Sequence, residues 1–328
     1  MKTINWGILG CNWIADRLAA AIAHCDGCEI AAAAARTEGN IRSFAARHNI
    51  PTYYTSLEEL CACSDVDVIY ISTPHGLHFE HAMQCLEAGK HVLCEKPFTV
   101  NTAEAQELFD AAKSKGLFIM EAMWTRFLPS TIKLGELARS GAIGEVRDTH
   151  INIAFTINRD NPASRYLAPD LAGGALLDIG VYALTIMDVV MGCVPSEILS
   201  RAHIGETGVD MHNSSILTYP DGAMASVTTA FDVNNTGDCI IYGTEGYITF
   251  DSCSSPMRIK CHNRADNTTE EFTYTHDCNG YEHEVEAVNR AIREGLLEDG
   301  TMPAAKTLEI MKQMDSIREQ WGYRYPME

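Results

Sequence analysis

Three side chains that can exchange or hold a proton stand where they could serve catalysis: Lys96, Asp178 and Tyr182. Lys96 follows a short apolar run, His91–Cys94, by two residues and precedes Pro97. Proline cannot donate to a sheet ladder, and it favours extended geometry in the residue before it. Lys96 is therefore expected at the carboxyl end of a buried strand, where open α/β sheets place their ligands.

Asp178 and Tyr182 are four residues apart in an apolar stretch, so a helix there would place them on one face. A carboxylate in such surroundings must be paired, metal-bound or face a wet cleft. When a hydride is exchanged at a carbinol carbon, a side chain must also exchange the hydroxyl proton. We assign Tyr182 as the acid/base, Lys96 as its partner and substrate anchor, and Asp178 as orienter or acceptor from a substrate hydroxyl. The alternative is an internally capped Asp178 and a core Tyr182.

The first third of the chain alternates apolar strands with amphipathic helices. Such a pattern is typical of a parallel sheet covered on both faces, so we predict a doubly wound Rossmann domain over residues 1–122. The strands are expected at 5–10, 28–35, 66–72, 91–94 and 117–120, and the helices at 14–24, 39–48, 78–88 and 102–115.

After residue 122 the pattern changes, and we predict a second domain, residues 123–328, that binds substrate. Turn signals at 220–222, 234–237 and 243–246 punctuate a strand-rich region, which predicts a mostly antiparallel sheet with one open face. A long strand is expected at 145–157, and helices are expected at 130–140, 175–191, 281–294 and 303–321. The last helix is free to pack back on the first domain.

A glycine turn joins the first strand to the first helix. The dinucleotide fingerprint GxGxxG/A is met by Gly10 and Ala15, with Asn12 at the middle position. Asparagine is the non-glycine residue that best tolerates positive φ, so we expect strain at Asn12. The backbone N–H groups of the helix start, including Trp13 and Ile14, are expected to face the cofactor phosphates.

The ends of the next strands extend this cofactor site. Arg36 and Thr37 follow the second strand where NAD-specific domains carry an acidic residue, and they suit a 2′-phosphate. We therefore predict NADP, with NAD as the alternative because Glu38 is close; Arg36 could also be a solvated loop residue. Further residues assigned to cofactor binding are Thr73, Pro74, His75, His78, Glu95 and Lys96; for the two histidines, capping or a surface position is the alternative.

Residues after the last Rossmann strand are expected to contact the substrate. Trp124 offers an aromatic face for a ring, and Arg126 can donate to hydroxyl groups; packing between the domains is the alternative. The full set assigned to substrate binding is Glu121, Trp124, Arg126, Phe155, Arg165, Asp178 and Tyr182. Glu282, His283 and Glu284 resemble metal ligands but lack a fourth group, so we interpret them as a solvated helix start and predict no metal.

Composition narrows the class of protein. With 328 residues, 46% of them hydrophobic and 21% charged, the chain suits two soluble globular domains. A formal charge of −19 argues against nucleic acid or anionic membrane as partners and favours a small-molecule substrate. The twelve cysteines are interpreted as scattered buried thiols in a reducing compartment, and no signal peptide or apolar run of roughly 20 residues is expected. These features predict a cytoplasmic protein.

The motifs together resemble one family. The glycine turn, Ser72-Thr-Pro74, Glu95-Lys-Pro97 and Gly173-Gly-Ala-Leu-Leu-Asp-Ile-Gly-Val-Tyr182 stand in the order seen in the Gfo/Idh/MocA oxidoreductases. Within this family, Met120-Glu-Ala-Met-Trp124 and a tyrosine at 182 resemble the dihydrodiol dehydrogenase and NADP-dependent xylose dehydrogenase branch. The resemblance implies a Rossmann domain, an open-faced sheet used for oligomerisation, and Lys96 at the nicotinamide.

We therefore expect an NADP-dependent oxidoreductase that transfers a hydride between nicotinamide C4 and a carbinol carbon of a pyranose sugar or trans-dihydrodiol. It is expected to form a homodimer, or a dimer of dimers, through the open sheet face. One alternative is an NAD-linked dehydrogenase of inositols or deoxysugars. Another is a dinucleotide-binding redox sensor without turnover, although a sensor has no need of Lys96, Asp178 and Tyr182 together.

Overall fold

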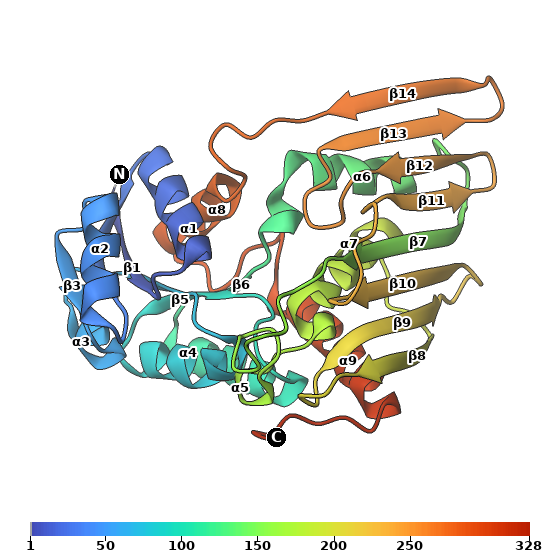
Figure 1. Cartoon of the computed structure of the whole chain (residues 1–328). Coiled ribbons are helices and arrows are strands. Elements are labelled where there is room, and N and C mark those ends of the chain that lie inside the picture. Colours follow the sequence, from blue (N-terminus) through green and yellow to red (C-terminus); the bar gives the residue numbers. More distant parts are fainter. Residues whose placement is uncertain (1) are drawn as a thin grey trace. The chain divides into compact units, whose positions relative to one another are not determined.

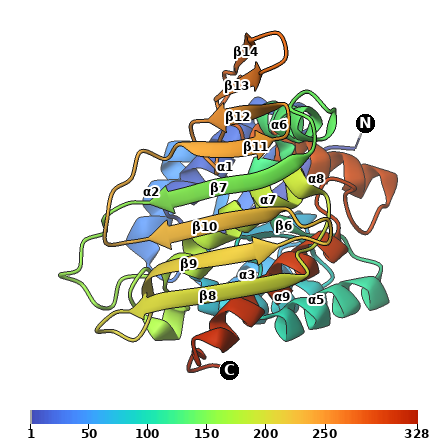
Figure 2. The same cartoon turned by 90° about the vertical axis from the view of Figure 1, so that its right-hand side faces the viewer.

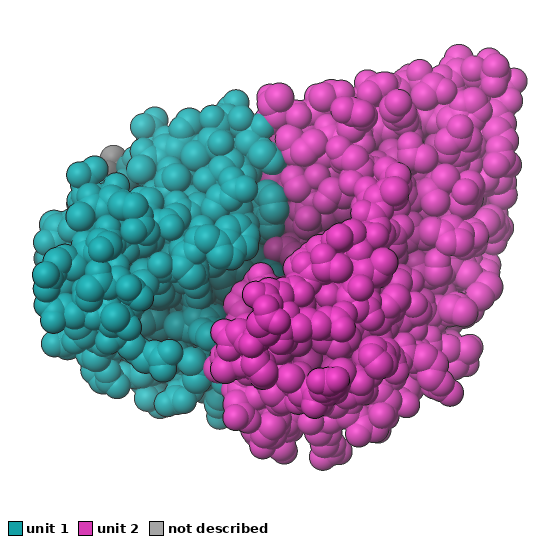
Figure 3. Space-filling view, in the orientation of Figure 1, with its two compact units in different colours: residues 1–124, 276–308 teal, residues 125–275, 309–328 magenta. Residues whose placement is uncertain are grey.

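The computed structural model describes residues 2–328, which form two compact units. Unit 1 runs up to residue 124 and includes residues 276–308; unit 2 comprises residues 125–275 and 309–328 (Figure 3). The chain thus crosses between the units three times, whereas the sequence suggested a single boundary at 122. Residues 276–308 join unit 1 because helix α8 (Glu282–Glu294) packs on helix α1 (Trp13–His24).

Unit 1 is built on a six-stranded sheet whose neighbouring strands all run parallel. Its strand order is β3-β2-β1-β4-β5-β6, the order of a doubly wound dinucleotide-binding fold. The order reverses between β1 and β4, and ligands of such sheets bind at the carboxyl edge of that point. The strands are β1 (Ile4–Leu9), β2 (Cys28–Ala34), β3 (Thr52–Tyr54), β4 (Val68–Ile71), β5 (His91–Glu95) and β6 (Ile119–Ala122).

Helices cover the unit 1 sheet on both faces (Figure 1). Helix α1 packs against α2 and α8, while α4 packs against α3 and α5. The remaining bounds are α2 (Glu38–His48), α3 (Leu57–Ala62), α4 (His78–Glu87) and α5 (Thr102–Lys115). The sequence had indicated neither β3 nor α3, because three- and six-residue elements are too short to show a period.

Unit 2 is built on an eight-stranded sheet of order β14-β13-β12-β11-β7-β10-β9-β8. Among these strands only β7 and β10 pair in parallel. The predicted turn at 234–237 is therefore not a hairpin, since it carries the chain from β10 across β7 to β11. The strands are β7 (Val146–Ala154), β8 (Glu197–Ile204), β9 (Asp210–Thr218), β10 (Met224–Ala230), β11 (Cys239–Gly243), β12 (Gly246–Phe250), β13 (Arg258–Asn263) and β14 (Thr268–Thr273).

Helices α6 (Pro129–Arg139) and α7 (Val181–Met191) cover one face of this sheet, and the other face is turned to the viewer in Figure 2. Helix α9 (Ala304–Gln320) begins in unit 1 and continues in unit 2. The segment Pro169–Met191 is long and apolar enough to cross a membrane, which the sequence reading missed. Because 89% of its apolar window is buried inside the structure, it is a core helix.

The cysteines are free thiols, and most are buried or half-buried. Cys25 and Cys28 form a Cys-x-x-Cys pair that the interpretation of scattered cysteines overlooked. Both thiols lie near backbone carbonyls, and burial raises the pKa of Cys25 to about 12. Within residues 2–328 no group of three His, Cys, Asp or Glu side chains could hold a metal ion.

Candidate functional site

The glycine turn after β1 approaches the end of β4 closely. Gly10 has φ of +110°, and a Cβ there would lie 2.3 Å from Ser72 Oγ. Only glycine combines this φ with this contact, so the first position of the fingerprint has a structural reason. The Gly10 N–H also donates to Ala34 O at 2.8 Å, which places the turn beside the end of β2.

Asn12 differs from its expected role. Its φ is −93°, so it carries no left-handed strain, and it is the N-cap of α1. Its Oδ1 accepts hydrogen bonds from Ile14 N at 3.1 Å and Ala15 N at 3.0 Å. These N–H groups, which were predicted to face phosphates, are therefore occupied by a side chain. Asn12 Nδ2 donates to Ser72 O at 2.6 Å and so ties the turn to β4.

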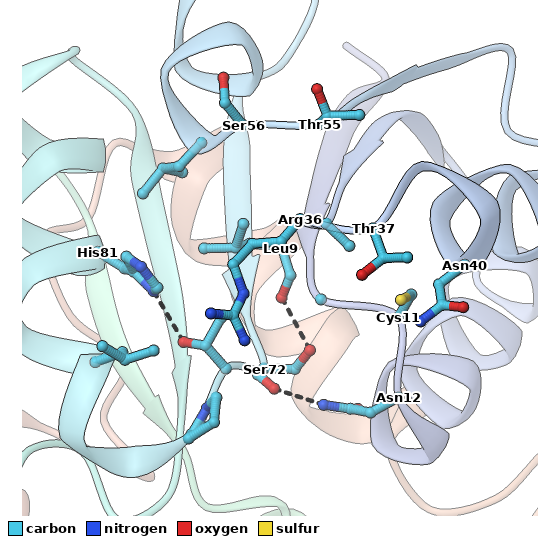
Figure 4. Close-up of a pocket in the computed structure, with 16 residues that line it drawn as sticks. Leu9, Cys11, Asn12, Arg36, Thr37, Asn40, Thr55, Ser56, Ser72 and His81 are labelled. Carbon is cyan, nitrogen blue, oxygen red and sulfur yellow. Dashed lines mark hydrogen bonds between the residues drawn. The ribbon is translucent and has the colours of Figure 1, made fainter. Parts of the chain in front are cut away.

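A cavity of about 510 Å³ opens at this edge of the sheet. Figure 4 shows His81 on one side of it and Thr37 with Asn40 on the other, with Arg36 extending between them. The predicted residues Gly10, Asn12, Arg36, Thr37, Thr73 and Pro74 line it, together with Leu9, Cys11, Ala35, Asn40, Thr55, Ser56, Leu57, Ser72, Leu77 and His81. The site therefore has the size and position for the adenosine half of a dinucleotide.

Several of these residues were missed by sequence reasoning. Thr55 and Ser56 belong to the β3–α3 connection, and that region lacked a predicted element. His81 lies one helical turn after His78, and its Nδ1 is 3.0 Å from Thr73 Oγ1. A histidine three residues after a predicted contact at a helix start was the available signal.

Glu38, the acidic residue two positions after Arg36, does not line the cavity. Glu38 Oε1 is 2.5 Å from Arg42 Nη2 on the same exposed helix face. Trp13, also predicted to contact cofactor, is 60% exposed and does not line the cavity. The described side chains around the cavity thus leave Arg36 as its cationic group.

His78 lies inside unit 1, contrary to a surface or capping position. Its ring nitrogens lie 2.9 Å from Pro97 O and 2.8 Å from Thr73 O, and its exposure is zero. Burial lowers its pKa to about 4, against the two carbonyl contacts that favour the charged form. His78 therefore connects the cavity edge at Thr73 to the loop that carries Lys96. His75 is also buried and packs edge-on against His78, with ring centroids 5.7 Å apart.

Lys96 follows β5 directly, as the sequence predicted, and its peptide bond to Pro97 is cis. Glu95 precedes it and is buried rather than open to a ligand. Glu95 Oε1 accepts from Tyr70 Oη at 2.6 Å, and Oε2 accepts from Lys96 N at 3.2 Å. A buried carboxylate thereby holds the backbone at the catalytic candidate.

A second buried carboxyl group lies near Glu95. Glu284 on α8 has zero exposure, and within residues 2–328 neither of its carboxyl oxygens has a hydrogen-bond partner. Burial and the nearby Glu95 raise the pKa of Glu284 well above its usual value. Glu282 is also buried and accepts hydrogen bonds from the N–H groups of residues 278–280. The expected solvated helix start is therefore wrong for Glu282 and Glu284.

Glu121 does not have the placement expected of a substrate ligand. It is 1% exposed; its Oε1 accepts from Phe98 N at 3.1 Å, and its Oε2 accepts from Thr307 Oγ1 at 2.9 Å. It therefore joins the loop after Lys96 to α9. Trp124, in unit 1 as well, stacks on Tyr281 with ring centroids 4.5 Å apart.

In unit 2, Arg126 is engaged with an acidic partner. Its Nη1 lies 2.5 Å from Asp188 Oδ2, and both side chains are largely buried. Phe155, predicted to touch substrate, packs against Phe231 and Tyr166 with ring centroids 5.3 and 6.3 Å away. These contacts favour structural roles for Arg126 and Phe155.

Asp178 and Arg165 form an ion pair in unit 2. Arg165 Nη1 is 2.8 Å from Asp178 Oδ1, and the Asp178 side chain is 4% exposed while that of Arg165 is 35% exposed. Arg165 Nη2 also donates to Tyr166 Oη at 2.9 Å, and the guanidinium lies over the Tyr166 ring. A carboxylate in apolar surroundings requires a partner, and Arg165 is that partner for Asp178. Arg165 had been predicted from the sequence as a substrate-binding residue.

The backbone at Asp178 is not a regular α-helix. Leu176–Gly180 forms a π-helical turn, which continues into α7 at Val181. π-Helical turns are rare in proteins overall, and many of those that occur lie at functional sites. The same-face placement of Asp178 and Tyr182 therefore does not follow from α-helical spacing. Lys96 belongs to unit 1 and both of these residues to unit 2, so a joint role stays a prediction.

Comparison with known proteins matches both parts of the chain to one family. Residues 4–123 match a model described as the GFO/IDH/MocA oxidoreductase family, NAD-binding Rossmann fold. Residues 131–249 match the GFO/IDH/MocA C-terminal domain.

Individual proteins align over most of the chain. A trans-1,2-dihydrobenzene-1,2-diol dehydrogenase from Mus musculus is 31% identical over 334 residues, covering 99% of each chain. A D-xylose 1-dehydrogenase (NADP(+)) from Hypocrea jecorina is 35% identical over 307 residues, covering 83% of this chain and 77% of its own. A crystal structure of a 3-ketoreductase from Actinomadura kijaniata with NADP has a TM-score of 0.89 at 24% identity, covering 98% of each chain.

The buried Glu284 generates a prediction about stability. Its pKa is raised on folding, so the folded state binds the proton more tightly and stability falls as pH rises above about 4.5. Glu284→Gln removes this loss. We expect its melting temperature to exceed that of the wild type by at least about 2 °C at high pH, with a smaller difference near pH 5.

Differential scanning calorimetry between about pH 5 and pH 9 measures this, with the exposed Glu286→Gln on the same helix as control. An equal difference in melting temperature between Glu284→Gln and the wild type at every pH would contradict the raised pKa of Glu284.

Proposed function

The chain belongs to the GFO/IDH/MocA oxidoreductase family, and we propose that it is an NAD(P)-dependent dehydrogenase of sugars or polyols in which Lys96 and Tyr182 exchange the proton. The reaction is hydride transfer between nicotinamide C4 and a carbinol carbon of a cyclic polyol, such as a pyranose or a trans-dihydrodiol. The observation that carries the proposal is the contact of His78 with both Thr73 O and Pro97 O. It connects the edge of the nucleotide cavity to the loop of Lys96.

The cavity at the carboxyl edge of β1 and β4 fits a dinucleotide. Gly10 allows the tight turn between β1 and α1, and Arg36 and Thr37 line the cavity where the ribose of such a cofactor lies in this fold. When a cofactor is bound, its nicotinamide group would supply the hydride acceptor or donor. The protein must orient the substrate hydroxyl, exclude water and carry the proton.

Tyr182 is proposed as the acid/base, with its Oη taking the proton from the substrate hydroxyl or returning it. Lys96 Nζ is proposed to share this proton and to anchor the substrate oxygen. Asp178, fixed by Arg165 at 2.8 Å, is proposed to orient the set or to accept a hydrogen bond from a second substrate hydroxyl. A cyclic polyol offers both hydroxyl groups, which is why this substrate class fits.

We expect Lys96→Ala to abolish turnover while the dissociation constant for NADP changes by less than about tenfold, or 1.4 kcal/mol. Tyr182→Phe should lower kcat by about 10²- to 10⁴-fold, the usual worth of a general acid or base. Absorbance at 340 nm with a panel of aldoses and diols gives turnover, and fluorescence titration gives cofactor affinity.

The exposed Lys113→Ala serves as the control for a lost lysine charge. Full activity of Lys96→Ala would contradict the mechanism. Tight NADP binding by the wild type with no turnover of any polyol would instead favour the redox sensor.

We propose a preference for NADP over NAD. Arg36 extends into the cavity beside Thr37 and Asn40, so a 2′-phosphate would meet a cation and two polar side chains (Figure 4). Glu38, the nearest competing acid, is paired with Arg42.

Arg36→Ala is expected to raise the KM for NADP by at least about tenfold, the worth of one charge-assisted hydrogen bond, and to leave the KM for NAD almost unchanged. Initial rates with each cofactor measure the ratio. Lys113→Ala removes an exposed cation that does not line the cavity and is the control. Equal changes for both cofactors would contradict a 2′-phosphate site at Arg36.

We further propose that the chain assembles as a homodimer, or a dimer of dimers, through the open face of the unit 2 sheet. Leu199 on β8 pairs directly with Ile216 on β9, and the two side chains are 57% and 46% exposed. The same face continues through His150, Tyr242, Tyr247 and His262, whose rings lie in sequence across β7, β11, β12 and β13. Contiguous apolar and aromatic surface of this kind marks interaction sites.

The free thiols fit a cytoplasmic enzyme.

Ile216→Arg is expected to shift the protein toward monomer, because it places a charge in the centre of the proposed interface. Sedimentation velocity at several concentrations measures this. Ile132→Arg, at an equally exposed position on α6, should keep the wild-type state. A monomeric wild type, or an Ile216→Arg variant that assembles like it, would overturn the proposal.

A further inference from the structure

The segment before Asp178 is held by residues that lie far away in the sequence. Tyr325, three residues before Glu328, donates from its Oη to Gly173 O at 2.6 Å. Asp210, at the start of β9, accepts at Oδ2 from Leu176 N at 2.8 Å. The two bonds bracket the Gly173–Gly174 turn and the first residue of the π-helical turn that contains Asp178.

Asp210 acts as a cap supplied by another element. The first N–H groups of a helix lack partners within the helix, and Asp210 satisfies that of Leu176. Asn213 Nδ2 donates to the same Oδ2 at 2.8 Å and also contacts Thr229 Oγ1 at 2.7 Å, so the carboxyl group is itself fixed. Gly174 has φ of +117°, and a Cβ there would lie 2.2 Å from Asp210 Oδ1.

The segment that carries Tyr325 is held in place by hydrogen bonds and ion pairs. Arg318 on α9 contacts both carboxyl oxygens of Glu328, at 2.6 and 2.9 Å, and also Asp315 Oδ1 at 2.8 Å. Glu328 Oε2 accepts in addition from Tyr325 N at 2.7 Å. The Arg318 guanidinium lies over the Tyr325 ring, 5.0 Å from its centroid. Tyr325 is 2% exposed and Arg318 is 4% exposed, so the tail is packed into unit 2.

We propose that Asp210 and Tyr325 are positioning residues for catalysis, which hold the Gly173–Gly174 turn and through it Asp178 and Tyr182. The inference rests on the proposed function, because it assigns Asp178 and Tyr182 to the reaction. Neither Asp210 nor Tyr325 needs to touch substrate. Tyr325 thereby has a positioning role that no motif in the sequence marks.

The bonds act on the backbone of the functional segment and not on its surroundings. Both end on main-chain atoms within five residues of Asp178, at Gly173 O and Leu176 N. The π-helical turn that contains Asp178 begins at the second of these bonds, at Leu176. Loss of an outside bond should therefore shift Asp178 and Tyr182 before it unfolds the unit.

Asp210 also makes this positioning dependent on pH. Burial raises its pKa to about 7, against the bonds from Leu176 and Asn213 and the charge of Arg318. The other titratable groups that face it are Tyr323 and Tyr325. Below this pH the carboxyl group is neutral and is a weaker acceptor for Leu176 N.

The consequences for activity and stability have opposite signs. Because the pKa is higher in the folded state, the stability contribution of Asp210 is full below pH 3.8 and declines as pH rises to about 7. Positioning by the charged carboxylate should instead improve over the upper part of that range. A residue with a purely structural role would not raise kcat where it lowers stability.

The matched pair Tyr325→Phe and Tyr323→Phe tests the inference. The Tyr325 hydroxyl donates to Gly173 O, whereas the buried Tyr323 hydroxyl has no hydrogen-bond partner among the residues that the structure describes. We expect Tyr325→Phe to lower kcat about tenfold, as loss of one buried hydrogen bond allows, with the KM for NADP almost unchanged. Tyr323→Phe should keep the wild-type kcat. Asp210→Asn should lose the rise in kcat near pH 7.

Hydrogen exchange of the peptide spanning residues 173–182 gives a readout without turnover. Exchange there should be faster in Tyr325→Phe and Asp210→Asn than in Tyr323→Phe, and Glu328→Gln should show the same effect from a site remote from Gly173. Unchanged exchange in these variants would overturn the positioning role. Faster exchange together with an inactive wild type would overturn only the proposed function, and equal kcat for Tyr325→Phe and Tyr323→Phe would remove the link to catalysis.

Discussion

Close approach between the Gly10 turn and Ser72 is the contact on which the nucleotide side of the molecule depends. A Cβ at position 10 would lie only 2.3 Å from Ser72 Oγ, so the turn requires glycine. Asn12 Nδ2 also donates a hydrogen bond to Ser72 O at 2.6 Å. These contacts bring the ends of β1 and β4 together at the point where the strand order reverses. From there, His78 extends the connection through Thr73 to Pro97 and the adjacent lysine.

Unit 2 uses the same physical device at a second glycine. Gly174, also at positive φ, makes room for the carboxyl group of Asp210, which then caps the turn before Asp178. In both units a polar side chain occupies the space that a Cβ would fill, close to the start of the helix that follows. A glycine at such a position fixes a backbone geometry that no other residue could adopt without strain.

Buried carboxyl groups form a second common feature. Glu95, Glu121 and Glu284 lie inside unit 1 and Asp210 lies inside unit 2, and each is at most 7% exposed. Glu95 and Glu121 bond backbone N–H groups on either side of the Lys96–Pro97 peptide. Because burying a carboxylate is costly unless it is bonded, these groups stabilise one specific conformation of the loop.

Residues whose role depends on distant partners were the ones that sequence reasoning misplaced. Asn12 was expected to hold positive φ, but Ser72 lies within reach of its amide and favours a cap. Glu121 and Arg126 follow a motif that suggests substrate contact, yet Thr307 and Asp188, 186 and 62 residues away, occupy them. Cys25 and Cys28 show the opposite error, since their spacing was visible in the sequence and was overlooked.

The sequence by itself determined the doubly wound domain, the glycine turn, the position of Lys96 at a strand end and the family, because each depends on local patterning over a few residues. Only the tertiary structure decided that α8 completes unit 1, that the chain crosses β7 between Ala230 and Cys239, and that Arg165 pairs with Asp178. It also revealed the bonds of Asp210 and Tyr325 to the turn before Asp178. Such contacts join residues tens to hundreds of positions apart, and no local pattern records which of many polar side chains will meet when the core closes.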